Sequence, residues 1–472
     1  MHDIYDLIVI GSGPAGEKGA AQAAYFGKRV ALVEREPVLG GASVNTGTIP
    51  SKTLRESALH LSGFLQRGFR EAVDFTITGI SVDDFMYRKQ LVVEKEWSQI
   101  EQNLRRHHVD RYEGNARFLS PTRIAVTSAA GEQILEAAVI LIATGSSPYR
   151  PANVPFDDEA ICDSDTILQT KTIPASLAVV GAGVIGCEYA SIFAALGVEV
   201  HLVDGRTSLL PHLDRECVRV LLGELQNRLG VTLHLGTDVK DIDRGEHAVA
   251  LTLADGRTIT AEKVLYAAGR SSNTAQLDLA AANVTTANRG LIVVNEHYQT
   301  STPNIYAAGD VIGFPALAST SMEQARVAMV HAFDLKYKTR VAPILPYAIY
   351  TIPELATVGM TEEDCRAKNV AFAVGRASFR DNARGQIIGD VKGLVKLVFD
   401  PTTLTLLGVH IVGESAAELL HSGMMVMQFG GTINAFIDSV FNFPTLGEAY
   451  KYAAYDGLGA VARMAMSKPV ID

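Results

Sequence analysis

Two glycine-rich segments have the residue types and the spacing that bind a pyrophosphate. Their glycines, which repeat at an interval of 170 residues, are Gly11, Gly13, Gly16, Gly181, Gly183 and Gly186. The first glycine of such a segment permits a tight turn, the second lets phosphate approach the backbone, and the third lets a helix pack on a strand. Free N–H groups at the helix start then donate to the phosphate. Two segments of this kind indicate two dinucleotide sites.

Each glycine segment is followed by a carboxylate at the same distance. Glu34 lies 23 positions after Gly11, and Asp204 lies 23 positions after Gly181. In dinucleotide-binding folds an acid at about this offset ends the second strand and accepts hydrogen bonds from ribose hydroxyls. The shared offset argues against two unrelated glycine loops. The simplest pairing of ligands is one tightly held flavin dinucleotide and one exchanging nicotinamide dinucleotide.

The second site carries a mixed signal for the type of nicotinamide dinucleotide. Asp204 favours NAD, because a 2′-phosphate would meet its carboxylate. Arg206 follows two residues later and has the charge to pair with such a phosphate. From the sequence alone, Arg206 is equally well a solvated loop residue, so both interpretations stay open.

The pattern of apolar residues predicts the strands and helices that position these loops. The expected strands are 5–10, 29–34, 177–180 and 198–204, and the expected helices are 14–26 and 184–196. Further apolar strands end in small residues or an acid at 139–145, 263–269 and 304–310. This alternation indicates α/β structure with parallel sheets and an internal duplication. From about residue 342 the pattern favours an antiparallel sheet with a long helix near 415–429.

The length and composition restrict the number of domains and the classes of partner that we expect. The chain has 472 residues, of which 47% are hydrophobic and 20% charged, and its net charge is −10. This length predicts two to four domains, and the acidic balance disfavours nucleic acid or an anionic membrane as a partner. The apolar stretch Leu177–Val203 is long enough to span a membrane. Because it contains fingerprint glycines, Glu188 and Glu199, we expect strand, turn, helix and strand instead.

The four cysteines are few and scattered. They are Cys162, Cys187, Cys217 and Cys365, and none forms a CxxC or CxxxxC pair. The sequence therefore predicts neither a metal site nor a local redox pair. Scattered cysteines suit a reducing compartment, so a cytoplasmic location is expected.

Several longer segments add a family resemblance over essentially the whole chain. They are MHDIYDLIVIGSGPAGEKGA, GGASVNTGTIPSK, ATGSSP, VVGAGVIGCEYA, AAGRSSNT, TSTPNIYAAGDVIG, YAIYTIPELATVGMTEE and FNFPTLGEAY. In these segments the chain resembles the flavoprotein disulfide reductases that bind two dinucleotides. The segments NTGTIPSKTLRE, ICDSDTIL, IGCEYASIFAALGV, IYTIPE and FNFPT resemble the transhydrogenase branch of that family.

The resemblance implies a fold class and a division into domains. The class is α/β, with two Rossmann-like dinucleotide-binding domains and an α+β C-terminal dimerisation domain. The expected parts are FAD-binding domain 1–148 and 271–341, NAD(P)-binding domain 149–270 and dimerisation domain 342–472. A homodimer or higher homo-oligomer is implied, in which FNFPTLGE reaches the partner's active site.

The resemblance also implies which residues contact FAD and NAD(P). The expected set is Gly11, Gly13, Pro14, Ala15, Gly16, Glu34, Arg35, Gly41, Ala42, Ser43, Gly47, Thr48, Lys52, Ala116, Ala143, Thr144, Gly145, Gly181, Gly183, Val184, Ile185, Gly186, Glu188, Asp204, Arg206, Ala268, Gly269, Arg270, Gly309, Asp310, Leu317 and Ala318. Within this set, Asp310 is expected on the ribityl chain. Leu317 and Ala318 are expected to begin a helix that faces the flavin pyrimidine.

Lys52 and Glu188 are the expected catalytic residues. Glu188 lies in the middle of an apolar helix, and a buried carboxylate needs a partner. The resemblance implies that this partner is Lys52, placed beside flavin N5. A cation there would stabilise negative charge on the ring.

The residues of disulfide chemistry are missing. The resemblance places two redox-active cysteines where Ser43 and Thr48 stand, and a proton-shuttling histidine where Phe443 stands. Thiol–disulfide exchange needs a thiolate, which serine and threonine cannot supply. Glu448 remains, without an imidazole to orient. The expected activity is therefore ping-pong hydride transfer through FAD, in which NADPH reduces FAD and NAD⁺, using the same site, takes the hydride.

Two other functions stay open at this point. An NAD(P)H:acceptor oxidoreductase of the diaphorase or quinone reductase type would keep the same cofactors and pass electrons to another acceptor. A non-catalytic, NAD(P)H-responsive flavoprotein belongs to a different class. The presence of Lys52, Glu188 and both glycine segments argues against this last interpretation.

Overall fold

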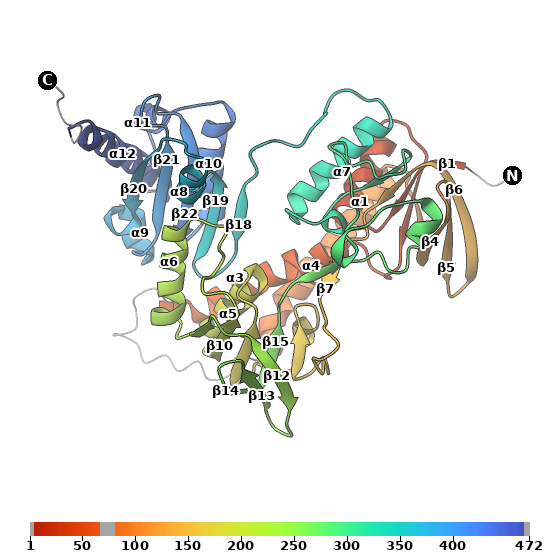
Figure 1. The fold of residues 1–472 in the computed structure, drawn as a ribbon, viewed down its shortest axis with the longest axis horizontal. Coiled ribbons are helices and arrows are strands. Elements are labelled where there is room, and N and C mark those ends of the chain that lie inside the picture. The colour runs from red at the N-terminus through yellow and green to blue at the C-terminus, as the bar shows by residue number, and fades with distance from the viewer. Residues whose placement is uncertain (1–3, 67–80, 467–472) are drawn as a thin grey trace.

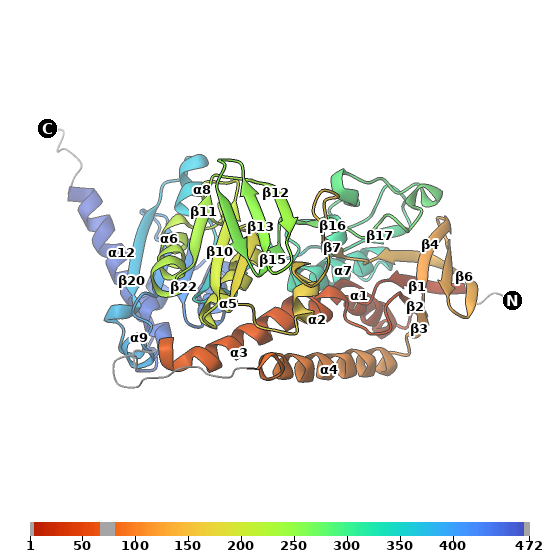
Figure 2. The ribbon, with the colours of Figure 1, turned by 90° about the horizontal axis from the view of Figure 1, so that it is seen from below.

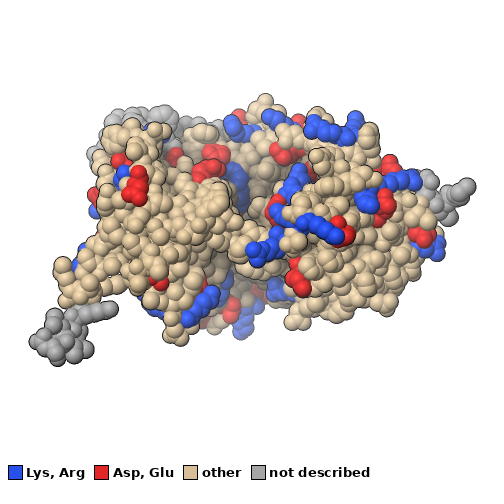
Figure 3. All heavy atoms as spheres, turned by 90° about the horizontal axis from the view of Figure 1, so that it is seen from above, with Lys and Arg blue, Asp and Glu red and all other residues tan. Residues whose placement is uncertain are grey.

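Three main β-sheets organise the chain, and each carries its own helices, so that three lobes are visible in Figure 1. The structure is a computed structural model and describes residues 4–66 and 81–466. The N-terminal lobe lies at the right of the figure, the C-terminal lobe at the left, and the central lobe below them. Figure 3 shows Lys and Arg interspersed with Asp and Glu over one face of the molecule, so this face carries no broad patch of one sign.

The first sheet has the order β3-β2-β1-β6-β5-β4, and β17 pairs with β6. Its strands are β1 (Ile4–Ile10), β2 (Val30–Glu34), β3 (Asp110–Glu113), β4 (Asn115–Ser120), β5 (Arg123–Ser128), β6 (Gly131–Ile142) and β17 (Ile305–Ala307). The predicted strands at 5–10 and 29–34 are confirmed. The strand expected at 139–145 is only the end of β6, because the first half of β6 pairs antiparallel with β5 while its second half runs parallel to β1.

Two helices pack together on this sheet. They are α1 (Pro14–Tyr25) and α7 (Ala318–Ala332), which lie side by side in Figure 1. A Cβ atom at Gly19 would lie 2.4 Å from the Leu141 side chain and 3.5 Å from Ala325 Cβ. Glycine at this place therefore lets α1 approach β6 and α7 closely. The starts of both helices face the same cavity, which is described below.

Three more helices follow β2 in the chain. They are α2 (Gly41–Asn45), α3 (Thr48–Gln66) and α4 (Val82–Arg106). Figure 2 shows α3 and α4 side by side along the lower edge of the molecule. Buried Arg55 on α3 donates from Nε to the carbonyl of Thr351 in the C-terminal lobe at 2.9 Å. Helix α3 thus joins the N-terminal lobe to the others.

The second sheet has the order β11-β10-β9-β15-β8 and is parallel throughout. Its elements are β8 (Ile161–Asp163), β9 (Ser176–Val180), α5 (Val184–Ala195), β10 (Glu199–Asp204), α6 (Arg215–Gly223), β11 (Thr232–Leu235) and β15 (Lys263–Tyr266). A small antiparallel sheet beside it holds β12 (Val239–Arg244), β13 (Val249–Leu253) and β14 (Thr258–Ala261), and a two-stranded ladder pairs β7 (Ser146–Pro148) with β16 (Arg270–Ser272). The apolar stretch Leu177–Val203 is β9, α5 and β10, as expected. Within the described residues, we find no helix with the length and apolar character that crossing a membrane requires.

The third sheet is antiparallel, with the order β18-β19-β22-β21-β20. Its strands are β18 (Tyr347–Ile349), β19 (Glu354–Gly359), β20 (Ala373–Ser378), β21 (Leu394–Phe399) and β22 (Leu406–Gly413). Its helices are α8 (Glu362–Ala367), α9 (Ala383–Ile388), α10 (Ala416–Gln428), α11 (Asn434–Asp438) and α12 (Ala449–Met466). Single 3-10 turns lie at Thr166–Gln169, Leu279–Ala282, Asn288–Gly290, Asp310–Ile312, Phe379–Asp381 and Leu446–Glu448, and a π-helical turn lies at Glu224–Arg228. The antiparallel sheet and the long helix near 415–429 are confirmed.

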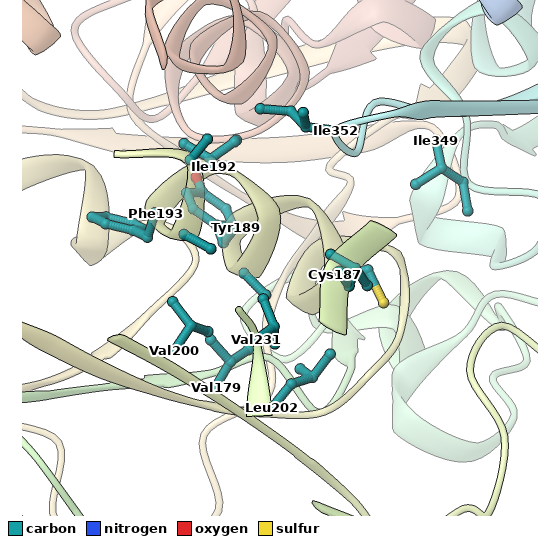
Figure 4. Packing of buried hydrophobic residues seen from close by; sticks show 14 of the residues in the cluster. Val179, Cys187, Tyr189, Ile192, Phe193, Val200, Leu202, Val231, Ile349 and Ile352 are labelled. Atoms are coloured by element: carbon teal, nitrogen blue, oxygen red, sulfur yellow. The ribbon is translucent and has the colours of Figure 1, made fainter. Parts of the chain in front are cut away.

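Helix α5 lies where the three lobes meet. Its buried side chains pack on β9 and β10, and residues from α3 and the C-terminal lobe complete the same hydrophobic cluster. Figure 4 shows this packing, with labels on Val179, Cys187, Tyr189, Ile192, Phe193, Val200, Leu202, Val231, Ile349 and Ile352. Such dense packing tolerates little displacement, so α5 holds its side chains in fixed positions relative to α3.

A buried lysine also joins the central and C-terminal lobes. Lys396 on β21 is 1% exposed. Its Nζ lies 2.7 Å from Asp214 and 2.6 Å from Glu362. Asp214 in turn caps α6 by accepting hydrogen bonds from backbone N–H groups of its first turn. A charge this deep is stable only with such partners.

Candidate active site

The first glycine loop runs from β1 into α1 and cannot accept larger residues at its first and third glycines. Gly11 has φ +101°, and a Cβ there would lie 2.4 Å from the carbonyl oxygen of Ala143. A Cβ at Gly16 would lie 1.8 Å from the carbonyl oxygen of Gly11. Helix α1 begins at Pro14, and its N-cap, Gly13, makes no side-chain cap bond. N–H groups of the first turn can therefore donate to an anionic ligand.

Glu34, at the end of β2, holds this loop in place by hydrogen bonds. Its side chain accepts hydrogen bonds from Ser12 N–H at 2.8 Å and from the Ser12 hydroxyl at 2.6 Å. The Ser12 hydroxyl accepts one from Gly40 N–H at 3.0 Å. The acid thus fixes the loop between β1 and α1 against the segment that leads into α2. We did not predict this role of Ser12, because nothing in the spacing of the sequence motifs indicates it.

The second loop, between β9 and α5, repeats the first. Gly181 has φ +107°, and a Cβ at Gly186 would lie 1.8 Å from the Gly181 carbonyl oxygen. Gly183 is the uncapped N-cap of α5 and faces open space. Asp204 at the end of β10 accepts a hydrogen bond from Ala182 N–H at 2.7 Å. The same backbone geometry therefore occurs twice in one chain.

A cavity of about 1090 Å³ brings most of the predicted cofactor residues together. Of that set it is lined by Gly11, Gly13, Pro14, Ala15, Glu34, Arg35, Gly41, Ala42, Ser43, Gly47, Thr48, Lys52, Ala116, Ala143, Thr144, Gly145, Val184, Ile185, Glu188, Arg270, Gly309, Asp310, Leu317 and Ala318. A second cavity of about 180 Å³ is lined by Gly181, Asp204 and Ala268. The predicted residues that line neither are Gly16, Gly183, Gly186, Arg206 and Gly269. Gly16 and Gly186 instead lie where helix and strand touch.

Each cavity contains a buried hydroxyl without a hydrogen-bond partner among the described residues. Thr144 Oγ1 belongs to a residue lining the larger cavity, and Thr237 Oγ1 to one lining the smaller. A buried hydroxyl without a partner is costly. A polar ligand in either cavity would supply the partner. The two glycine loops and these hydroxyls together fit two dinucleotides.

Lys52 and Glu188 make the contact that was predicted for them. Lys52 Nζ donates to both carboxylate oxygens, at 2.9 and 2.7 Å. The Glu188 side chain is 4% exposed and that of Lys52 is 27% exposed. Tyr350 N–H donates to Glu188 at 2.9 Å, and the Lys52 ammonium lies 5.0 Å from the centre of the Tyr350 ring. Tyr350 is a site residue that the sequence alone did not identify.

A chain of polar contacts links Arg270, predicted to lie near NAD(P), to Asp310, predicted to bind FAD. Arg270 donates from Nε to the Ser146 hydroxyl at 2.8 Å and from Nη2 to the Ser146 carbonyl at 2.7 Å. The same hydroxyl donates to Asp310 at 3.0 Å. Asp165 lies 3.8 Å from Arg270, and burial raises the pKa of its carboxyl group. Ser146 and Asp165 were also not identified from the sequence, although both lie within segments of the family resemblance.

Replacing Ser146 with alanine is expected to raise KM for the nicotinamide nucleotide about tenfold, because Arg270 and Asp310 lose the hydroxyl that joins them. The measurement is steady-state kinetics with NADPH and NADH. Ser147→Ala is the control, because it removes a neighbouring strand hydroxyl that donates to Asn273 Oδ1 at 2.8 Å. Equal effects of the two variants would contradict a linking role for Ser146.

The positions that the resemblance assigns to a dithiol hold hydroxyl residues. Ser43 lies in α2 and Thr48 starts α3, and both line the larger cavity. All four cysteines are free and buried elsewhere. Burial raises the pKa of Cys187 to about 12 and that of Cys162 to about 11, which disfavours the reactive thiolate. Position 443 holds a phenylalanine, which is 73% exposed, and therefore supplies no imidazole.

Fold and cavities together define an α/β oxidoreductase that holds two dinucleotides. The chain belongs to the pyridine nucleotide-disulphide oxidoreductase family: residues 5–332 match the model of that description, and residues 345–454 match the model of its dimerisation domain. Membership in this family implies binding of FAD and NAD(P).

Two relatives that are similar over the full length carry the same name. The soluble pyridine nucleotide transhydrogenase of Mycobacterium tuberculosis is 47% identical over 96% of this chain and 97% of its own. The protein of the same name from Marinomonas sp. is 40% identical over 97% of this chain and 99% of its own.

Solved structures with the same fold are also similar over the whole chain. A Cu(II) complex of the HOCl-induced flavoprotein disulfide reductase RclA of Escherichia coli has a TM-score of 0.87 at 27% identity and covers 96% of this chain and 99% of its own. LpdA of Mycobacterium tuberculosis has a TM-score of 0.87 at 29% identity, covering 95% and 99%.

Proposed function

We propose that this protein transfers hydride between NADPH and NAD⁺ through FAD and uses no redox-active disulfide. The observation that carries the proposal is a cavity lined by the first dinucleotide loop, by the start of the helix that follows the second loop and by the Lys52–Glu188 pair, but with Ser43 and Thr48 where a dithiol would be needed. The names of the relatives at 40–47% identity support the same activity.

In this proposal, residues in and around the two cavities bind the two dinucleotides. The loop at Gly11–Gly16 and Glu34 hold the FAD pyrophosphate and ribose, and Asp310 holds the ribityl chain. The loop at Gly181–Gly186 and Asp204 hold the exchanging nucleotide, with Arg270 beside it. Bound FAD supplies a ring that accepts a hydride from one nicotinamide and returns it to another.

The proposed roles of Lys52 and Glu188 are electrostatic. The Lys52 ammonium provides a fixed positive charge at the reacting end of the cavity, where negative charge develops during hydride transfer. Glu188 fixes the direction of the ammonium through two hydrogen bonds. Neither residue needs to exchange a proton, because hydride transfer depends on alignment and exclusion of water.

We also propose a homodimer that acts in the cytoplasm. The match to the dimerisation domain and the exposed apolar side chains there, among them Phe429 and Val440, support the dimer. Four buried free cysteines support a reducing compartment. The domain division at 148, 270 and 341 remains part of the proposal.

The test is an anaerobic assay on the purified protein. Bound FAD is identified by its absorbance, and transfer from NADPH to a thionicotinamide analogue of NAD⁺ is followed over a matrix of both concentrations. Parallel double-reciprocal lines are expected, as ping-pong transfer requires. Flavin bleaching without transfer to the analogue would favour the acceptor oxidoreductase. Absence of bleaching would favour the binding protein, and turnover of lipoamide or glutathione disulfide would contradict the argument from Ser43 and Thr48.

A further inference from the structure

Arg55 follows Lys52 by one turn of α3, and its partners belong in part to the C-terminal lobe. The residue is 4% exposed and lines neither cavity. Besides the bond from Nε to the Thr351 carbonyl at 2.9 Å, its Nη1 lies 2.6 Å from Glu56 and 3.1 Å from Glu354. A planar guanidinium that is bonded on several sides has its direction fixed. Arg55 therefore holds these groups in a defined arrangement.

The segment 350–352 connects α3 to α5 by hydrogen bonds. Tyr350 N–H donates to Glu188 Oε1 at 2.9 Å, and Ile352 N–H donates to the Ser191 hydroxyl at 3.1 Å. The same hydroxyl donates to the Glu188 carbonyl at 2.8 Å. These bonds attach the first and last residues of the segment to α5, while its central carbonyl accepts the bond from α3 described above.

This segment also determines how the Glu188 carboxylate is oriented. The carboxylate accepts one hydrogen bond from Tyr350 N–H and two from Lys52 Nζ. If Tyr350 moved, the carboxylate would lose a bond or turn, and the ammonium would turn with it. Apolar packing beside the segment, seen at Ile352 in Figure 4, is not directional. The bond from Arg55 is directional and so sets the angle of the segment.

Arg55 reaches a further part of the cavity wall through Glu354. The carboxylate accepts from Ala417 N–H at 3.1 Å, in the first turn of α10, and Ala417 lines the larger cavity. Burial raises the pKa of the Glu354 carboxyl group, and the charge of Arg55 opposes this rise. The guanidinium thus joins α3, the segment 350–352 and α10, and each of these contributes residues to the lining of the larger cavity.

We propose that Arg55 is a positioning residue for hydride transfer. Its guanidinium fixes the segment 350–352, so that Tyr350 N–H stays on the Glu188 carboxylate. The carboxylate in turn holds the Lys52 ammonium at the reacting end of the cavity, where a small displacement of a fixed group changes the rate. The inference rests on the proposed electrostatic role of Lys52, because Arg55 lies outside the cavity and acts only through these residues.

The test compares the midpoint potential of the flavin in holoenzyme variants. Arg55→Met/Glu354→Gln removes the donor to the Thr351 carbonyl together with one charge of each sign, so no buried acid is left unpaired by the change. Reduction of the flavin is expected to have a tenfold smaller equilibrium constant, which is a potential lower by about 30 mV for a two-electron couple. Its rate of reduction by NADPH is expected to fall about 10- to 100-fold. An unchanged potential and rate would overturn the proposal.

Arg55→Lys separates the charge of the residue from its geometry. An ammonium can pair with Glu354, but as a point charge it does not reproduce the fork that also reaches the Thr351 carbonyl. Thermal unfolding is expected near the wild-type Tm, while the potential and the rate shift as in the double variant. Wild-type values of all three would show that the charge alone suffices, and would contradict a positioning role.

Lys396 provides a matched control, because it is also a buried cation between two lobes. Lys396→Met/Asp214→Asn removes one charge of each sign from a pair that lines neither cavity. The two other acids at Lys396, Glu216 and Glu362, keep Arg376 at 2.7 and 3.2 Å. A lower Tm with an unchanged flavin potential is expected. A potential shift as large as that of the α3 variants would show that any weakening between lobes suffices, and would refute the inference.

The same measurement on Lys52→Met separates this inference from the function on which it rests. If Lys52→Met leaves the flavin potential unchanged, the electrostatic role of Lys52 fails, and the role of Arg55 fails with it. If Lys52→Met lowers the potential and the Arg55 variants do not, the role of Arg55 alone is refuted. Transfer from NADPH to the NAD⁺ analogue by the wild type decides the transhydrogenase proposal independently of these potentials.

Discussion

Lys52→Met is expected to slow hydride transfer from NADPH by about 10²- to 10³-fold, the usual effect of removing one fixed electrostatic group from an active site. Among the described residues, the variant also leaves buried Glu188 with the N–H of Tyr350 as its one remaining hydrogen-bond partner. That change is expected to destabilise the protein by about 3 kcal/mol, near the lower end for a broken buried pair, since Lys52 is itself partly exposed. Stopped-flow absorbance and thermal unfolding measure the two effects.

The double variant Lys52→Met/Glu188→Gln separates the two effects. Glutamine removes the unpaired charge and keeps an oxygen that can accept from Tyr350 N–H. Stability is expected to recover, while the transfer rate stays low. Recovery of both would show that the lysine only supports the structure and would contradict the electrostatic role.

Lys18→Met is a matched control for burial. Lys18 pairs with Glu17 at 2.8 Å, and the side chains are 29% and 7% exposed, against 27% and 4% for the Lys52–Glu188 pair. Neither residue lines a described cavity. Loss of stability with an unchanged transfer rate is expected for this variant.

Gly186→Ala is expected to abolish nicotinamide binding and to destabilise the central lobe by more than about 4 kcal/mol, as severe backbone clashes do. The added Cβ would lie 1.8 Å from the Gly181 carbonyl oxygen and 3.3 Å from Val179 Cγ1. The carbonyl oxygen belongs to the backbone, so it cannot move away without displacing the loop. Retained flavin absorbance that NADPH no longer bleaches would report this loss.

Gly183→Ala gives the complementary result. A Cβ at Gly183 meets nothing within 4 Å, and its φ of −80° suits alanine. The protein is expected to fold with an unchanged Tm but to bind NADPH at least tenfold more weakly, because the methyl group lies where phosphate must approach the backbone. Gly223→Ala in the same lobe, whose nearest neighbour would be Asn227 at 3.8 Å, is the control. Normal affinity in Gly183→Ala would refute the placement of the pyrophosphate.

Much of the fold was predictable because its signals are local. The strand and helix pairs around both loops follow from apolar periodicity and from glycines that the backbone itself requires. The start of β6 was not predictable, because its first half is set by pairing with β5, and no signal within the strand reveals that partner. The contact of Lys52 with Glu188 came from the family resemblance and from the need of a buried acid for a partner.

The sequence by itself determined that there are two dinucleotide loops, that each has its acid, and that no cysteine stands beside the expected flavin. These features depend on residue type and short spacing, so folding is not needed to recognise them. Only the tertiary structure decided that Tyr350 completes the Lys52–Glu188 pair, that Ser146 joins Arg270 to Asp310, and that Arg206 closes on Asp204. The first two contacts unite residues more than a hundred positions apart. The first forms where three lobes pack around α5, and the second where β7 pairs with β16. The last depends on a side-chain direction that spacing cannot specify.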